Sequence, residues 1–250
     1  MKTLRMYGMA LVAIVLSVSL ASCSKNNNPV KGEDGVVVNE KKLTRIVSQR
    51  DTTRFQYDGN GRLIKSDTYY NTSTLIWKDN TIDLDNSHSW PFKYILTIEN
   101  GRVQNEEGIE DGYIYYTYNS ANRLTDILYV ADYESQLESF QWDGDKIISI
   151  SGEDYKISFT YKQMCNKGYF PLFDHFCGWN DHKLYEAHPE LIGIRTKELP
   201  ASITYNDSDG YNQTTTCSYE FDTEGYITKI IMEEGNEIET YTLTWVQFPR

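Results

Sequence analysis

The chain has 250 residues, of which 24 are basic and 36 are acidic, giving a formal net charge of −12. This acidic balance argues against nucleic acid as a partner and against electrostatic docking on anionic lipid, because both require a positive surface. About 210 residues follow the N-terminal segments described next, which is enough for one domain with a full hydrophobic core.

The N-terminus has the pattern of a lipoprotein signal peptide. Lys2 and Arg5 precede an apolar run over residues 9–20, which ends in Leu20-Ala21-Ser22-Cys23. The small residues at 21 and 22 give a peptidase access to the backbone, and the thiol of Cys23 is the atom that accepts a lipid. The apolar run is too short to span a bilayer as a helix. The pattern predicts a signal peptide over residues 1–22 and lipidation at Cys23.

The next segment, residues 23–40, has the composition of a flexible tether. It is polar, has no apolar period and contains two glycines that favour turns. Removal of Lys2 and Arg5 with the signal lowers the basic count from 24 to 22 against 36 acidic residues, so the mature chain carries a net charge of −14. This charge favours solubility over recognition of a cationic ligand. We predict that residues 41–250 form a single β-repeat domain.

A short pattern recurs along this domain, and we call it the hairpin phrase. It consists of two aromatic residues separated by one residue, a polar turn, and then a basic or polar residue followed by an aliphatic one. In the first copy, alternation places Phe55 and Tyr57 on one face of a strand, and the glycine-containing turn that follows suits a tight hairpin before Leu63 restarts the alternation. The clearest copies begin at Phe55, Tyr116, Phe140 and Tyr219.

Weaker copies of the hairpin phrase fill most of the gaps, at Leu75, Leu96 and Phe159. The second apolar position falls at residues 57, 77, 98, 118, 142 and 161, so the step is about 20 residues, or two strands and two turns. We therefore predict an all-β fold, a long antiparallel meander of about 12–16 strands that is strongly curved or forms an open barrel.

A membrane-spanning barrel is the alternative for a sheet of this width. Such a barrel needs an outward apolar band on nearly every strand. Charged residues interrupt the candidate strands here, and a lipid anchor would be redundant for an integral barrel. These charges, which disfavour a spanning barrel, are Lys65, Lys93, Asp126, Lys156 and Lys229.

One stretch, residues 163–200, interrupts the rhythm of the repeat. The apolar residues Phe170, Phe173 and Phe176 crowd its first half. Its centre suggests a helix that is capped by Asn180 or Asp181 and stopped near Pro189. We expect this insertion to be partly helical and to pack as a plug or lid over one end or face of the sheet.

The insertion concentrates the residues that could carry chemistry. A zinc site would need ligands in close pairs, and only His175 and Cys177 are so spaced. In an exported protein a disulfide between Cys165 and Cys177, two free thiols and a metal site remain as alternatives, with the disulfide favoured and no metal or other cofactor expected. The remaining Cys217 lies in a polar strand and is expected to be an ordinary buried thiol. The candidate ligand-binding residues are His175, Trp179 and His182.

No catalytic residue is predicted. The Asp-His neighbours at 174–175 and 181–182 lack a nucleophile in a recognised setting, and adjacent side chains point in different directions. Acidic clusters such as Glu106-Glu107 and Glu233-Glu234 fit charged hairpin tips better than a pair of glycosidase carboxylates. With 20 tyrosines and 5 tryptophans, however, the chain has aromatic faces that could stack on sugar rings.

Several motifs together resemble a known family. The lipobox at Cys23, the Tyr-Asp hairpin phrases, the stretch His188-Pro189-Glu190-Leu191-Ile192-Gly193 and the following Leu199-Pro200 are similar to lipoproteins of unknown function from Gram-negative gut anaerobes. The hairpin phrase alone is also similar to the Tyr-Asp repeats of large secreted toxins. The family resemblance implies a porin-like, barrel-type β fold and no activity, and it assigns no catalytic residues.

Two classes of function follow from the sequence. We favour a non-catalytic envelope lipoprotein, anchored by lipid to the outer membrane on its periplasmic or surface side, monomeric, without nucleic acid, and binding a glycan or a protein ligand. The alternative is an envelope hydrolase whose site lies under residues 163–200.

Overall fold

The computed structural model describes residues 41–87, 92–108, 112–131, 134–171 and 183–248. The strands and helices are β1 (Lys41–Val47), β2 (Thr52–Tyr57), β3 (Leu63–Asp67), β4 (Thr72–Trp77), β5 (Thr81–Ser87), β6 (Phe92–Glu99), β7 (Arg102–Gly108), β8 (Gly112–Tyr118), β9 (Leu124–Val130), β10 (Ser135–Asp143), β11 (Lys146–Ser151), β12 (Tyr155–Cys165), α2 (Leu184–Ala187), the 3₁₀ helix η1 (Pro189–Ile192), β13 (Glu198–Asp207), β14 (Asn212–Phe221), β15 (Ile227–Glu234) and β16 (Glu237–Gln247).

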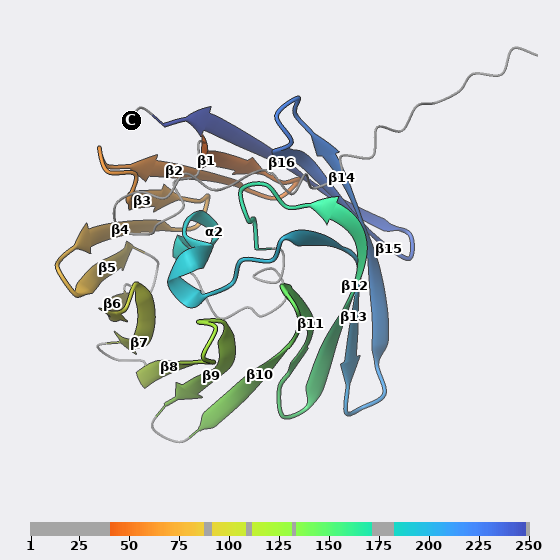
Figure 1. The fold of residues 1–250 in the computed structure, drawn as a ribbon, viewed down its shortest axis with the longest axis horizontal. Coiled ribbons are helices and arrows are strands. Elements are labelled where there is room, and N and C mark those ends of the chain that lie inside the picture. Colours follow the sequence, from red (N-terminus) through yellow and green to blue (C-terminus); the bar gives the residue numbers. More distant parts are fainter. Residues whose placement is uncertain (1–40, 88–91, 109–111, 132–133, 172–182, 249–250) are drawn as a thin grey trace, which may run out of the picture.

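These strands form one closed antiparallel barrel. Each pairs with its neighbours in sequence, and β1 pairs with β16 to complete the ring. Figure 1 shows the strands around a central space that contains α2. The structure confirms the predicted all-β meander with one partly helical insertion. Closure also protects the two edges of this wide sheet, since a closed barrel has no unpaired edge strand.

Hydrogen bonds between successive repeats explain the hairpin phrase. The second aromatic residue of a copy points into the barrel and donates its ring N–H or O–H to the carbonyl of the aliphatic residue in the preceding copy. Thus Trp77 Nε1 donates to Leu63 and Tyr161 Oη donates to Ile147. Five second aromatic residues make inward bonds of this kind, at 2.5–2.7 Å: Tyr57, Trp77, Tyr118, Trp142 and Tyr161, with Tyr57 donating to Leu43 on β1 because no copy precedes it. Two further aromatic donors make similar bonds at 2.7 Å: Tyr219, the first aromatic residue of its copy, donates to Pro200, and Trp245 on β16 donates to Ile227.

The basic residue of the phrase takes part in the same contact between successive repeats, which we call the latch. Arg62 lies over the Trp77 ring at 5.8 Å, and Arg123 lies over the Trp142 ring at 5.5 Å. The basic residue of one copy therefore places its charge over the aromatic ring of the next copy, and the aliphatic residue that follows it accepts a hydrogen bond from that ring's N–H. The hairpin phrase fixes how each repeat joins its predecessor as well as the hairpin itself.

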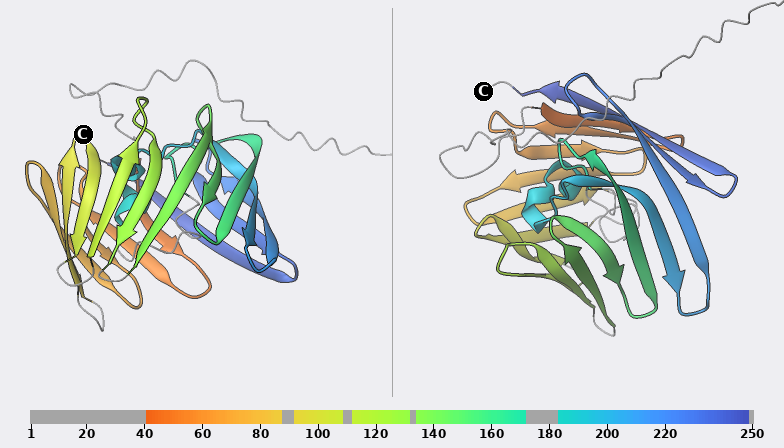
Figure 2. Two further views of the ribbon diagram at one scale, coloured as in Figure 1. Left: turned by 90° about the horizontal axis from the view of Figure 1, so that it is seen from below. Right: turned by 45° about the vertical axis from the view of Figure 1, so that its right-hand side comes forward.

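The barrel has two unlike ends. The turns of the hairpin phrase, the insertion between β12 and β13, the start of β1 and the finish of β16 lie at one end, which we call the plug end. The turns that join β1 to β2, β3 to β4, β13 to β14 and β15 to β16 lie at the other, which we call the groove end. Figure 2 shows α2 at the same end of the barrel as the C-terminus.

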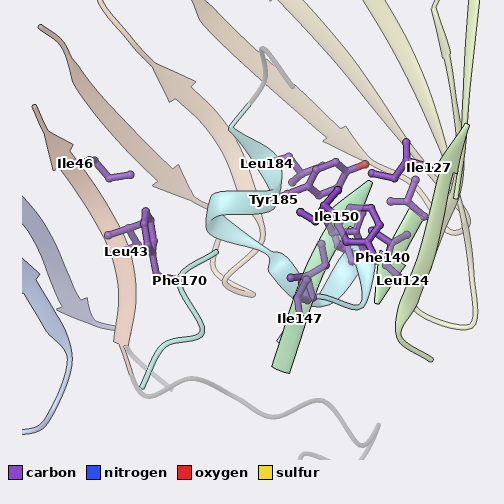
Figure 3. Packing of buried hydrophobic residues seen from close by; sticks show 14 of the residues in the cluster. Leu43, Ile46, Leu124, Ile127, Phe140, Ile147, Ile150, Phe170, Leu184 and Tyr185 are labelled. Carbon is purple, nitrogen blue, oxygen red and sulfur yellow. The ribbon is translucent and has the colours of Figure 1, made fainter. Parts of the chain in front are cut away.

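The insertion fills the plug end with apolar side chains. Phe170, Leu184, Tyr185 and Ile192 are each at most 2% exposed. Figure 3 shows Leu184 and Tyr185 projecting from α2 toward Phe140 and Ile127 on the barrel wall. This confirms the predicted plug, although the helix is short. It begins at Leu184, and Lys183 occupies the cap position without a side-chain cap bond, whereas the predicted cap residues Asn180 and Asp181 lie outside the described residues.

The outer face of the barrel is mainly polar. Alternation turns apolar residues inward and leaves hydroxyl and charged side chains outside, as on β14, where Cys217 is buried while Thr216 and Ser218 are exposed. Lys156 and Lys162 are likewise exposed on β12. Apolar side chains are also exposed on the outer face, among them Ile76, Leu137 and Val246, but charged and hydroxyl side chains interrupt them, whereas a spanning barrel turns a continuous apolar band toward lipid. Among the described residues there is also no helix long and apolar enough to cross a membrane.

Candidate functional site

A groove runs along the rim of the groove end. It consists of neighbouring cavities of about 260, 600 and 390 Å³ that share lining residues, and the third cavity reaches the outer side of β2, where Arg54 is exposed. Thr215 and Glu234 line both the first and the second cavity, and Gln49 and Arg50 line both the second and the third. The groove therefore extends from β13 across β14, β15 and β16 to the turns that follow β1 and β3.

The register of the strands directs these side chains inward. Tyr205 pairs with Gln213 and Ile203 pairs with Thr215 across β13 and β14, so each pair lies on one face of the sheet. Thr215 Oγ1 donates to Glu234 at 3.4 Å and carries this row onto β15. On the next pair of strands Met232 faces Glu239. Apolar and hydrogen-bonding groups thus alternate along one continuous wall.

Tyrosines form the β13 end of the groove. The Tyr205 ring lies parallel to Tyr155, with centroids 5.8 Å apart, and meets Tyr211 edge to face at 6.2 Å. Tyr211 remains 52% exposed, whereas Tyr205 is partly buried. Ile203 completes the wall of this first cavity. The result is an apolar corner with one ring available to solvent.

The middle of the groove is charged. Glu234, Glu237 and Glu239 line it together with Arg50. Burial and a hydrogen bond with Glu239 raise the pKa of the neighbouring Tyr241 above its ordinary value, so this phenol is a neutral group at physiological pH. The groove therefore offers carboxylates, a guanidinium and a phenol within one cavity.

Hydrogen bonds between turns hold the rim in place. Gln49 Nε2 donates to the Ile238 carbonyl at 3.2 Å, which ties the turn after β1 to β16. The Tyr69 N–H donates to Asp51 Oδ1 at 2.7 Å, which ties the turn after β3 to the turn after β1. A rim that is fixed before binding loses less conformational entropy when a ligand arrives.

The plug end contains a buried histidine whose ring nitrogens are both engaged. His188 Nε2 accepts the Leu63 N–H at 3.0 Å, so Nδ1 carries the proton and donates to Glu190 at 2.9 Å. The ring also meets Trp77 edge to face at 5.6 Å. This geometry holds the plug against β3 and leaves no ring nitrogen free to act as a base.

A second buried polar cluster joins the plug to the barrel wall. Glu106 on β7 is 1% exposed and accepts hydrogen bonds from Tyr116 and Tyr185. Burial and the Glu106 carboxylate raise the pKa of both phenols well above the ordinary value. Glu106 was expected at a solvated hairpin tip, and that prediction is wrong, because alternation on β7 turns its side chain into the barrel.

The structure describes few of the site residues that the sequence suggested. Cys23, His175, Cys177, Trp179 and His182 lie outside the described residues.

The described cysteines are Cys165 and Cys217. Cys165 ends β12, so the proposed disulfide with Cys177 stays a prediction. Cys217 is 4% exposed, and burial raises its pKa to about 11, which confirms an ordinary buried thiol. Within the described part of the chain, no three His, Cys, Asp or Glu residues are grouped to hold a metal ion.

Sequence reasoning missed the groove, and one signal could have pointed to it. Tyr69, Tyr70 and Tyr211 each follow turn-forming residues between strands instead of belonging to a hairpin phrase. Aromatic residues at turns outside the repeat are not needed for the latch, so their position indicates another role.

Comparison with known proteins identifies the fold. The chain is similar to a porin-like protein from Bacteroides uniformis, with 15% identity, a TM-score of 0.65, and coverage of 83% of this chain and 97% of that one. It is also similar to a porin-like protein from Bacteroides vulgatus, with 12% identity, a TM-score of 0.62, and coverage of 81% and 98%. Neither a protein-family model nor a curated protein matches the sequence. At these identities the likeness concerns the fold alone.

Proposed function

We propose that this protein is a non-catalytic lipoprotein of the cell envelope, anchored to the outer membrane through Cys23, and that it binds a ligand in the groove. The observation that carries the proposal is the contrast between a plug end filled by the insertion and a groove end with connected cavities. The ligand is a glycan or a protein segment, and the barrel acts as a monomer.

The polar exterior supports a separate anchor. A barrel that turns threonine, serine and lysine side chains outward would lose their hydration in a bilayer, so it needs other means of attachment. A lipid on Cys23 together with a second membrane contact would supply stable anchoring. The similar Bacteroides structures carry the name porin-like, which also favours an envelope location.

The first described residue, Lys41, lies at the plug end, opposite to the groove. A tether of residues 23–40 could span up to about 60 Å if fully extended. A lipid anchor on Cys23 would therefore leave room for a ligand to reach the groove.

Substitution of Cys23 tests the anchor. We expect the wild-type N-terminus to carry acyl chains by mass spectrometry, and Cys23→Ser to lose them and leave the membrane fraction. A wild-type chain with an unmodified Cys23 would contradict the proposal.

A thermal-shift screen tests the groove as the ligand site. The full chain is screened against soluble glycans, peptide pools and metal salts, because a ligand that binds the native state stabilises it by about 2.7 kcal/mol at about 100 times its Kd. The shift should disappear in the groove variant Arg50→Ala/Glu239→Ala and persist in the exterior control Lys156→Ala. A shift that survives in the groove variant, or no shift with any probe, would argue against a ligand site there.

The alternative hydrolase receives no support from the described part of the insertion. Its one described histidine, His188, is held by Leu63 and Glu190 and reaches no cavity named above. Non-catalytic binding therefore remains the better proposal.

A further inference from the structure

The most exposed aromatic rings of the described chain lie at the two ends of the groove. Tyr69 is 78% exposed, Tyr70 is 69% exposed and Tyr211 is 52% exposed. Tyr69 lines the third cavity and Tyr211 lines the first. Large aromatic rings left in water at the rim of a binding site mark a surface that a ligand covers.

The first cavity has the size and lining of a site for one sugar ring. Its volume of about 260 Å³ lies below the range of about 300–1,000 Å³ that encloses drug-sized molecules. Tyr205 and Tyr211 meet at 61°, which forms a corner of two aromatic faces. The C–H face of a pyranose packs on such a ring, while its edge carries hydroxyl groups that require polar partners.

Those polar partners lie beside the aromatic corner. Gln213, Thr215 and Glu234 line the same cavity and present an amide, a hydroxyl and a carboxylate. A sugar hydroxyl both donates and accepts, so it matches this mixed set of an amide, a hydroxyl and a carboxylate.

The charge of the whole groove selects among saccharides. The lining contains the carboxylates of Asp51, Glu234, Glu237 and Glu239 and the guanidinium groups of Arg50 and Arg54, an excess of two negative charges. This excess repels uronate or sulfate groups. Adjoining cavities continue the groove toward Tyr69, which suits several linked units better than a single sugar.

We propose that the groove binds a neutral oligosaccharide, with one sugar ring against Tyr211 and Tyr205 and the following units extending past Glu234 and Arg50 toward Tyr69. This rests on the proposed function, because it names the ligand class of the same groove. A peptide could use the same hydrogen-bonding groups, and it is treated as an outcome of the test.

Isothermal titration calorimetry with defined saccharides tests this assignment. The full chain is titrated with the neutral probes maltohexaose, cellohexaose, xylohexaose and mannohexaose, and with oligogalacturonate as the anionic probe. We expect at least one neutral probe to bind with a Kd below about 1 mM, and oligogalacturonate to bind more weakly.

Variants of Tyr211 test whether the sugar packs against its ring. Tyr211→Ala should weaken binding about tenfold or more, Tyr211→Trp should retain most of it, and Tyr113→Ala, which removes a ring from the outer face of β8, should change nothing. Unchanged melting temperatures establish that the variants fold. No binding of any neutral probe, or equal binding by Tyr211→Ala, would overturn the proposal.

The outcomes separate this inference from the function on which it rests. If peptides, but no saccharides, stabilise the chain and Arg50→Ala/Glu239→Ala abolishes that effect, the groove remains a ligand site and the saccharide assignment fails. If that double variant binds every probe as the wild type does, both fail.

Discussion

The two ends of the barrel use the same hairpins for different purposes. At the plug end, aromatic rings point inward, bond to the preceding repeat and pack beside a buried insertion, so polar groups such as His188 and Glu106 are tied to partners. At the groove end, tyrosines lie exposed at the turns, and Arg50 lies among carboxylates along connected cavities. The stabilising contacts and the proposed binding site therefore lie at opposite ends, which allows the rim to vary without disturbing the latches.

The largest contrast should come from removing a tyrosine at each end. Tyr185 is 1% exposed and bonds to Glu106, so Tyr185→Ala leaves a cavity and an under-satisfied buried carboxylate. We expect a loss of about 3–5 kcal/mol in the free energy of unfolding. Tyr70→Ala at the groove end should change it by less than about 0.5 kcal/mol. Chemical denaturation measures both, and equal losses would mean that the plug does not stabilise the barrel.

A smaller contrast is expected between two glycines with positive φ. Gly193 (φ 66°) lies against the turn between β8 and β9, and a Cβ added to it would lie 2.5 Å from the Asn122 carbonyl oxygen. Gly235 (φ 56°) lies in the turn between β15 and β16 with no atom within 4 Å of that position.

We expect Gly193→Ala to lower the free energy of unfolding by about 2–4 kcal/mol, because it combines backbone strain with overpacking. Gly235→Ala bears the strain alone and should lower it by about 1 kcal/mol. Thermal melts of the two variants give the comparison. If Gly235→Ala were the more damaging, the close contact of the plug with the barrel wall would be doubtful.

The sequence predicted the plug end better than the groove end, for a physical reason. The hairpin phrase repeats because each copy makes the same contacts with the copies before and after it. Arg62 and Leu63, for example, contact Trp77 of the next copy, so the contact can be recognised from residues that are close in the sequence. The number and order of strands follow from this repeated contact. Closure of the sheet required knowledge that β1 and β16 meet across the whole domain, which no local pattern contains.

The groove depends on such distant pairings throughout. Arg50 and Glu239 are far apart in the sequence and line one cavity only because the ring closes. Glu106 shows the same limit, since its hydrogen bond to Tyr185 joins β7 to the insertion. In the sequence Glu106 stands beside a second glutamate and shows no partner nearby, so the local pattern favours a charged hairpin tip.

The smallest contrast concerns carboxylates and pH. Burial acts to raise the pKa of Glu190, but the interaction with His188, which donates a hydrogen bond from Nδ1, and the charge of Arg195 outweigh it and hold that pKa well below its ordinary value of 4.5. A carboxyl whose pKa is lower in the folded state contributes its full stabilisation above its unfolded pKa of about 4.5, and this contribution is lost progressively as the pH falls from there through the lower folded-state pKa. At neutral pH, Glu190→Gln should therefore cost about 1–2 kcal/mol, and its difference from the wild type should shrink below pH 4.5. At the groove end, Asp67 pairs with Lys65, and both side chains are partly exposed, so Asp67→Asn should show the same trend with a smaller amplitude, because solvent screens that pair. Denaturant unfolding from pH 7 to pH 3 measures both differences, and a Glu190→Gln difference that is constant with pH would show that its charge does not hold the plug.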